Sequence, residues 1–146
     1  MKNDIKKVTI SAEEILGICE KIGTQISIDY EGKDPLFIGL LRGCNPFMTD
    51  MLKFVTIPCT LDYMKASSYH GTASTGKLTV LNYIPNVANK DVIIIDDIIT
   101  TGASMGMAAV LLKAAGAGRI VAAAVSIAYK DPFVKLDTDD RFFSKK

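Results

Sequence analysis

The chain has 146 residues, of which 49% are hydrophobic, and its charge is nearly balanced at 17 basic against 16 acidic residues. This length and composition predict one domain with a packed core over residues 1–146. The balanced charge argues against nucleic-acid and membrane partners and favours a small molecule. The N-terminal residues lack a signal-peptide core, and no apolar run approaches the roughly 18 residues of a membrane span. We therefore expect a soluble, cytoplasmic protein.

The cysteine and histidine content argues against a zinc site and against histidine-dependent hydrolysis. Cys19, Cys44 and Cys59 are widely spaced among apolar residues, and His70 is the single histidine. Zinc sites need several such ligands at short spacings, which this sequence does not offer. We expect all three to be reduced thiols in the core.

The first part of the chain predicts a helix, a strand and a second helix. Ser11 and Glu14 form a capping box, after which apolar residues recur at helical spacing. Residues 36–41 are an apolar run typical of a buried strand. Asn45 and Pro46 then fit the N-cap and first position of the next helix.

The remaining elements predict an α/β fold with a doubly wound, mostly parallel sheet. Strands are expected over residues 59–64 and 78–83, and a later helix is expected to end before Gly116, ahead of a last strand over residues 120–128. Between the strands over residues 59–64 and 78–83, residues 65–76 are polar, small and aperiodic. Loops of this length in compact domains are usually functional, although an ordinary hairpin connection is the alternative. The order of elements implies a parallel core with an antiparallel excursion.

Residues 92–104 are the most informative stretch of the sequence. Residues 92–95 are β-branched, which favours a central strand covered on both faces, and Asp96 and Asp97 follow where we expect the strand to end. Ligands of open α/β sheets bind at this edge. The next residues supply hydroxyls, a glycine and a helix N-terminus suited to an anion. The pattern indicates a sugar-phosphate site, although similar turns also occur as plain surface loops. These residues are Thr100, Thr101, Gly102, Ala103 and Ser104.

The run from Asp96 to Ser104 resembles the phosphoribosyl-pyrophosphate (PRPP) motif of type I phosphoribosyltransferases. Other segments match in the order expected for the hypoxanthine-guanine phosphoribosyltransferases. The resemblance implies a type I core with a flexible lid hairpin, and a shortened or remodelled hood over residues 129–146. The matching segments are Leu41-Arg42-Gly43, Asp62-Tyr63-Met64, Ser67-Ser68-Tyr69 and Lys130.

The same resemblance implies a role for each matching residue. Asp96 and Asp97 would hold the ribose hydroxyls and, with Thr100, contribute to catalysis. The two carboxylates would contact Mg²⁺ mainly through the substrate, and Asp140 is a further candidate metal ligand. The 5′-phosphate would bind Thr100, Thr101, Gly102, Ala103 and Ser104. The pyrophosphate would bind Leu41, Arg42, Gly43, Ser68 and Tyr69, and the base would contact Ile98 and Lys130.

Thr100 departs from the family pattern. The family motif has an aspartate at this position, the proposed acid or base at purine N7, and a threonine hydroxyl does not ionise near neutral pH. The usual proton-transfer role is therefore unfilled from this position. The tail departs as well, because residues 129–146 match the family hood only faintly, at Phe133-Val134 and Asp140.

The resemblance implies transfer of 5-phosphoribosyl from PRPP to a 6-oxopurine, with Mg²⁺ and release of pyrophosphate, in purine salvage. It also implies a homo-oligomer, a dimer or tetramer. Two alternatives stay open: a phosphoribosyltransferase with another base acceptor, and a non-catalytic module that senses PRPP or a nucleotide. A structural role through self-association is a third, carried by Phe133, Phe142 and Phe143.

Overall fold

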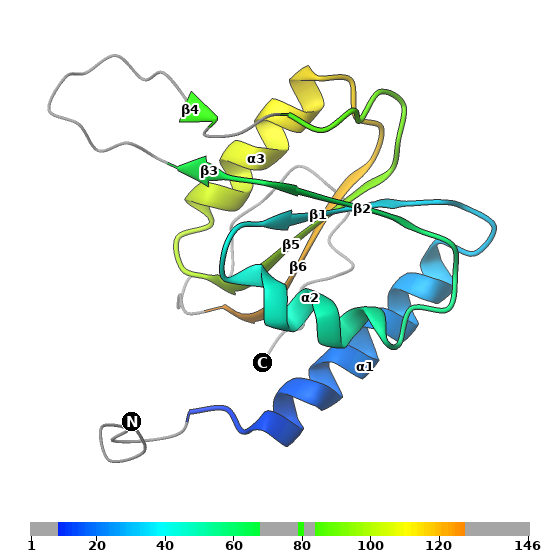
Figure 1. Cartoon of the computed structure of the whole chain (residues 1–146), viewed down its shortest axis with the longest axis vertical. Coiled ribbons are helices and arrows are strands. Elements are labelled where there is room, and N and C mark those ends of the chain that lie inside the picture. Colours follow the sequence, from blue (N-terminus) through cyan, green and yellow to red (C-terminus); the bar gives the residue numbers. More distant parts are fainter. Residues whose placement is uncertain (1–8, 68–78, 81–83, 128–146) are drawn as a thin grey trace, which may run out of the picture.

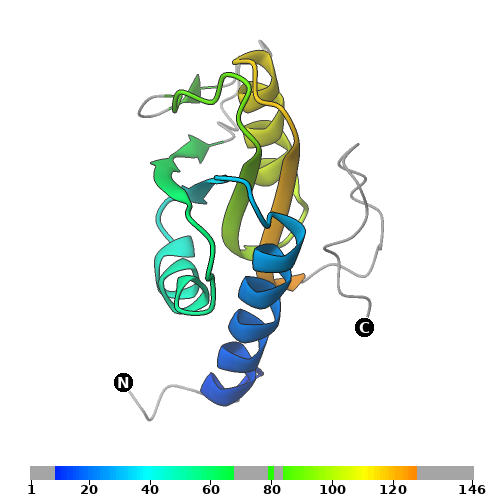
Figure 2. The same ribbon diagram turned by 90° about the vertical axis from the view of Figure 1, so that its right-hand side faces the viewer.

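The computed structural model describes residues 9–67, 79–80 and 84–127. Within them, a parallel sheet with strand order β2-β1-β5-β6 is covered by helices on both faces (Figures 1 and 2). The predicted α/β, doubly wound, mostly parallel sheet is therefore confirmed, whereas the single-domain assignment stays a prediction. The strands of the sheet are β1 (Leu36–Leu40), β2 (Thr60–Met64), β5 (Val92–Ile99) and β6 (Ile120–Ile127), and the helices are α1 (Ala12–Asp29), α2 (Cys44–Leu52) and α3 (Ala103–Ala114).

The ends of helices α1 and α3 are as the sequence predicts. Ser11 Oγ accepts a hydrogen bond from the Glu14 backbone N–H at 3.1 Å, and Glu14 Oε2 accepts one from the Ser11 N–H at 2.7 Å. This is the reciprocal capping box. Helix α3 is followed by Gly116 at a φ of 91°, the left-handed conformation that commonly ends a helix.

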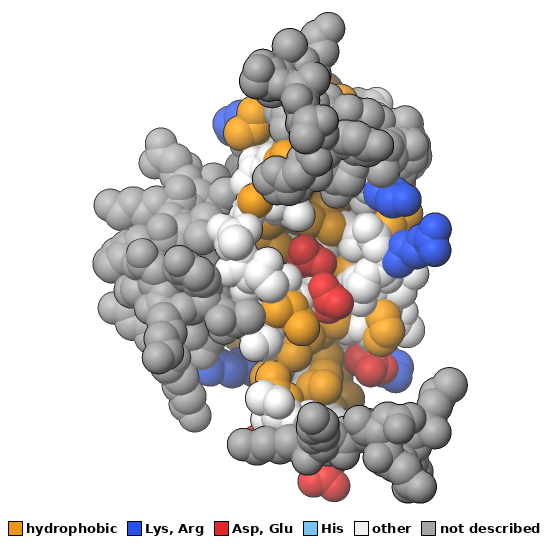
Figure 3. Space-filling model, turned by 90° about the vertical axis from the view of Figure 1, so that its left-hand side faces the viewer, with side chains coloured by type: hydrophobic (Ala, Val, Ile, Leu, Met, Phe, Trp, Pro, Cys, Tyr) orange, Lys and Arg blue, Asp and Glu red, His pale blue; other side chains and the backbone are white. Residues whose placement is uncertain are grey.

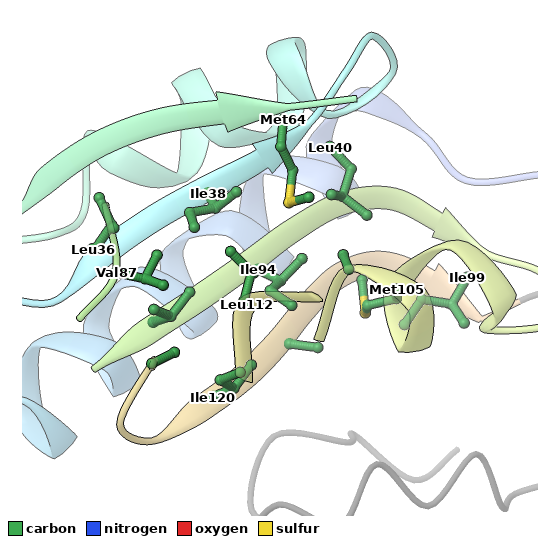
Figure 4. Packing of buried hydrophobic residues seen from close by; sticks show 14 residues of the cluster. Leu36, Ile38, Leu40, Met64, Val87, Ile94, Ile99, Met105, Leu112 and Ile120 are labelled. Atoms are coloured by element: carbon green, nitrogen blue, oxygen red, sulfur yellow. The ribbon is translucent and has the colours of Figure 1, made fainter. Parts of the chain in front are cut away.

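Two apolar clusters sandwich the sheet because side chains alternate across each strand. Ile94 packs with the residues of α3 on one face (Figure 4), while Ile93 and Ile95 pack with those of α1 and α2 on the other. All three are fully or almost fully buried. This two-sided burial explains why the first half of β5 is apolar at every position.

The winding of the chain reverses between β1 and β5. From β1 the chain passes through α2 to β2, and from β5 it passes through α3 to β6, on opposite sides of the sheet and toward opposite edges. Such a reversal opens a crevice at the carboxyl ends of the two strands. Strand β5 also extends further along β6 than along β1. Its pairing with β1 stops at Gly39 opposite Ile95, whereas its pairing with β6 continues to Ile99 opposite Ile127, which leaves open space beside the end of β5.

The predicted antiparallel excursion is confirmed at its base, where β3 (Ala66–Ser67) pairs antiparallel with β4 (Thr79–Val80). The predicted lid residues Ser68 and Tyr69 lie outside the described residues. So do Lys130, Asp140 and the rest of the predicted hood over residues 129–146. Among the described residues, no helix combines the length and apolar character needed to cross a membrane.

Two sequence-based boundaries were wrong. Helix α2 begins at Cys44 with Gly43 as its N-cap, and does not begin with Asn45 and Pro46. Gly43 already has helical angles (φ −65°, ψ −30°), and Pro46 still falls in the first turn, where its missing N–H is harmless. Strand β5 also continues through the acidic pair to Ile99, since the ladder with β6 persists there.

Candidate functional site

Asp96 and Asp97 follow the last paired position of β5 with β1, which is Ile95 opposite Gly39, and so lie at the reversal crevice. On the face of the molecule that Figure 3 shows, acidic side chains lie near the centre. The Asp97 backbone N–H donates to Asp96 Oδ1 at 2.9 Å, and the Ile98 N–H donates to Asp97 Oδ1 at 2.8 Å. Each carboxylate is thus held by the following peptide, and its other oxygen can accept a ligand hydroxyl.

The crevice is electronegative beneath these carboxylates. Burial raises the pKa of Asp96 to about 6, and the neighbouring Asp97 charge acts in the same direction, partly opposed by the Asp97 N–H. Burial, together with the charges of both aspartates, raises the pKa of the Cys44 thiol to about 11. Cys44 therefore remains a neutral thiol at neutral pH, which argues against a nucleophilic role.

The turn from β5 into α3 forms a small open pocket beside Asp96. Gly102 has φ 72° and ψ 0°, a conformation that glycine adopts without strain, and it is the N-cap of α3. Helix geometry leaves the N–H groups of Ser104 and Met105 without a helical partner one turn earlier. These donors suit an anion. The pocket is lined by Asp96, Ile98, Ile99, Thr100, Gly102, Ala103, Ser104 and Met105.

The loop after β1 reaches the same crevice from the other strand. The Leu41–Arg42 peptide bond is cis, and Arg42 and Gly43 are exposed. A Cβ added at Gly43 would lie 2.6 Å from Asp97 Cγ, so this loop and β5 are in direct contact. The structure therefore brings together the two segments that the sequence marks as strand-to-helix turns.

The predicted site residues divide into three groups. Asp96, Thr100, Gly102, Ala103, Ser104 and Ile98 line one pocket, with Ile98 48% exposed and available to a ligand. Asp97 follows Asp96 on β5 and lies against Gly43 of the Leu41-Arg42-Gly43 loop, whereas Thr101 is exposed and its Oγ1 accepts from the Ala103 N–H at 3.3 Å. Ser68, Tyr69, Lys130 and Asp140 lie outside the described residues, so their roles stay predictions.

Three further residues lie at this site that the sequence did not indicate. Ile99 and Met105 line the pocket, and Cys44 lies buried close to the carboxylates. The apolar pair that follows Asp97 was the available signal for Ile99, because it extends the strand past the carboxylates. No local pattern places Cys44 there, since its position depends on how α2 packs.

Comparison with known proteins agrees with this geometry. A family model described as phosphoribosyl transferase domain matches residues 10–145. The hypoxanthine-guanine phosphoribosyltransferase of Staphylococcus aureus (strain Mu50 / ATCC 700699) is 39% identical over 115 residues, covering 77% of this chain and 64% of that protein. The enzyme of that name from Streptococcus agalactiae serotype V is 42% identical over 107 residues, or 72% and 59% of the two chains. The chain thus spans less than two thirds of the length of these relatives.

Solved structures extend the match to the fold. A hypoxanthine phosphoribosyltransferase from Staphylococcus aureus has a TM-score of 0.77 at 36% identity, over 85% of this chain and 68% of that one. A hypoxanthine-guanine phosphoribosyltransferase from Bacillus anthracis has a TM-score of 0.74 at 27% identity, over 83% and 71%. The sheet, the reversal crevice and the family match over nearly the whole sequence lead to one conclusion: the chain belongs to the phosphoribosyltransferase family and has its type I core.

Proposed function

We propose that this protein transfers the 5-phosphoribosyl group of PRPP to a 6-oxopurine, hypoxanthine or guanine, in purine salvage. The bond from ribose C1′ to a pyrophosphate oxygen breaks, a bond from C1′ to a ring nitrogen of the base forms, pyrophosphate leaves with the bonding electrons, and the base loses one ring proton to a base or to water. The main support for this proposal is that the carboxylates, the turn before α3 and the β1–α2 loop meet at one crevice. The relatives named hypoxanthine-guanine phosphoribosyltransferase support the choice of acceptor.

Each part of the crevice suits one part of PRPP. The free oxygens of Asp96 and Asp97 accept hydrogen bonds from the ribose hydroxyls, and the N–H donors and hydroxyls of residues 100–104 bind the 5′-phosphate. Arg42 and the backbone of the β1–α2 loop face the pyrophosphate. In this arrangement most of the rate enhancement comes from positioning and from electrostatic stabilisation of the leaving group.

The base is proposed to lie against Ile98, whose side chain is exposed at the pocket. Lys130 is proposed to donate to the exocyclic oxygen of the purine, which would favour 6-oxopurines over adenine. Ser68 and Tyr69 are proposed to complete the pyrophosphate site when the lid closes and excludes water. These three residues are assigned from the motif match.

Mg²⁺ is proposed as the cofactor. Among the described residues, no group of three or more His, Cys, Asp or Glu side chains gathers to form a metal site. The Asp96–Asp97 pair still fits Mg²⁺, which keeps much of its water and binds through one or two carboxylates together with substrate phosphates. When bound, the ion would neutralise charge on the leaving pyrophosphate.

Steady-state assays with PRPP, Mg²⁺ and one base at a time test the proposal. We expect nucleotide formation with hypoxanthine and guanine, and much slower reaction with adenine, orotate and uracil. Faster reaction with another base would show that this base, and not a 6-oxopurine, is the acceptor. Binding of PRPP without turnover of any base would replace the enzyme with a PRPP-sensing module.

Thr100 favours one alternative within the family, an acceptor other than a 6-oxopurine. It is exposed at the pocket where the family pattern has an aspartate, so proton transfer at purine N7 lacks its usual carboxylate. An acceptor that needs no such transfer would suit this pocket, and the base panel distinguishes it. The proposed cytoplasmic location and the dimer or tetramer rest on the family, and sedimentation analysis checks the latter.

A further inference from the structure

We propose that Gly43 is a positioning residue for the Asp97 carboxylate. Because Gly43 has no side chain, the carboxylate occupies the space beside its Cα, and the β1–α2 loop and strand β5 are set as one unit. The inference rests on the proposed function, because it links the loop assigned to pyrophosphate with the carboxylate assigned to the ribose hydroxyls. It adds a steric role to a residue otherwise assigned only as a backbone donor.

The spacing between the two residues leaves no room for a methyl group. A Cβ at position 43 would lie 2.6 Å from Asp97 Cγ and 2.9 Å from Oδ1, and it would come closer still to Oδ2. Carbon atoms in contact normally lie about 3.5–4.0 Å apart. One of the two residues must therefore move when a side chain is added at position 43.

Asp97 is the residue that would move. Gly43 is the N-cap of α2, and the next residues of that helix include Cys44 and Phe47, which are buried in the core. Moving the helix would disturb this packing, which is costly. Within the described part of the chain, the Asp97 side chain accepts a 2.8 Å hydrogen bond from the Ile98 N–H, which rotation about its own side-chain bonds can break without moving a helix. Rotation of Asp97 breaks that bond and takes the carboxylate from its position over the crevice.

Backbone conformation does not explain the glycine. Gly43 has φ −65° and ψ −30°, which every L-residue adopts readily, and alanine would keep the N–H available to pyrophosphate. Gly43→Ala therefore adds a methyl group and leaves the proposed backbone donor in place. This makes the substitution a selective probe of the space beside Asp97.

Calorimetric titration with Mg²⁺-PRPP tests the coupling as a double-mutant cycle. Gly43→Ala should weaken PRPP affinity about tenfold, because a charged hydrogen-bonding group is displaced. In an Asp97→Ala background, the same change should alter affinity less than about twofold, since the clash is gone. Gly17→Ala, in α1 with nothing within 4 Å of its added Cβ, is the matched control and should have no effect. Equal losses in both backgrounds, or no loss in either, would overturn the inference.

A ligand-free measurement separates this inference from the proposed function. In amide NMR spectra, Gly43→Ala should shift the Ile98 N–H resonance upfield and speed its hydrogen exchange, because its bond to Asp97 Oδ1 is lost. Asp97→Ala should mimic this, and adding Gly43→Ala to it should change the Ile98 signal little. An unperturbed Ile98 signal in Gly43→Ala contradicts the positioning role. If the wild type binds no PRPP, the proposed function fails, and the NMR result still decides the steric question.

Discussion

The two halves of β5 belong to one strand but have opposite surroundings. Residues 92–95 have β1 and β6 on either side and helices on both faces, and they are buried. Residues 96–99 have β6 as their ladder partner in the described structure, with Asp96 and Asp97 half-buried and Ile98 exposed. The difference arises because pairing with β1 stops at Gly39 opposite Ile95. Because β5 extends beyond its pairing with β1, the strand whose first half is buried in the core carries polar groups at its other end.

The same substitution in each half tests this contrast most strongly. Ile94→Ala should lower the free energy of unfolding by about 4 kcal/mol, because it removes a fully buried side chain and leaves a cavity. Ile98→Ala should change it by less than about 0.5 kcal/mol, since Ile98 is 48% exposed. Urea denaturation of both variants provides the measurement. Similar losses in the two variants would contradict the division of the strand.

A substitution at Thr100, just after β5, tests whether the second half of the strand borders a catalytic site. Thr100→Asp introduces a carboxylate at the pocket beside Asp96 and should raise kcat for hypoxanthine about 100-fold, the lower end of what general acid-base catalysis contributes. Thr101→Asp adds the same charge one residue away, outside the residues that line the pocket, and should give no gain. A gain in neither variant would show that proton transfer does not limit the reaction through this position.

Asp96 gives the smallest expected effect, a pH dependence of stability. Its pKa is raised by burial from 3.8 to about 6, so the folded state binds this proton more tightly than the unfolded chain does. Its contribution to stability is therefore full below about pH 3.8 and lost as the pH rises through about 6. Asp96→Asn removes the buried charge and should raise the free energy of unfolding at pH 8 by about 1 kcal/mol, after allowance for solvent screening.

The gain from Asp96→Asn should disappear at pH 4, where the wild-type carboxyl is protonated. Denaturation curves of the two proteins at several pH values measure the difference. A gain that does not vary with pH would indicate a packing effect and would contradict the raised pKa.

The core elements could be predicted from the sequence because they carry strong local signals. The capping box at Ser11, the apolar run before Asp96 and the glycine after α3 each determine local structure through neighbours in the chain. Asp96 and most of the following turn lie at one pocket for the same reason, since a strand, a left-handed glycine and a helix start occur in succession.

The remaining features depend on tertiary contacts that no local pattern encodes. Strand β5 continues through its carboxylates because β6 offers partners as far as Ile127, and only the sheet register reveals this. The contact between Gly43 and Asp97 joins residues 54 positions apart, and the burial of Cys44 near them follows from the packing of α2. The early start of α2 likewise reflects Cys44 entering the core, which overrode the local signal of Asn45 and Pro46.

A calorimetric titration of Mg²⁺-PRPP into the wild type and the double variant Asp96→Asn, Asp97→Asn tests whether this end of β5 is the PRPP site. We expect the double variant to stay folded but to lose at least about 100-fold in PRPP affinity, because two charged acceptors for the ribose hydroxyls are removed. A cooperative thermal unfolding transition of the variant provides the control for folding. PRPP affinity that is unchanged in the folded double variant would contradict the assignment of this strand end as the PRPP site.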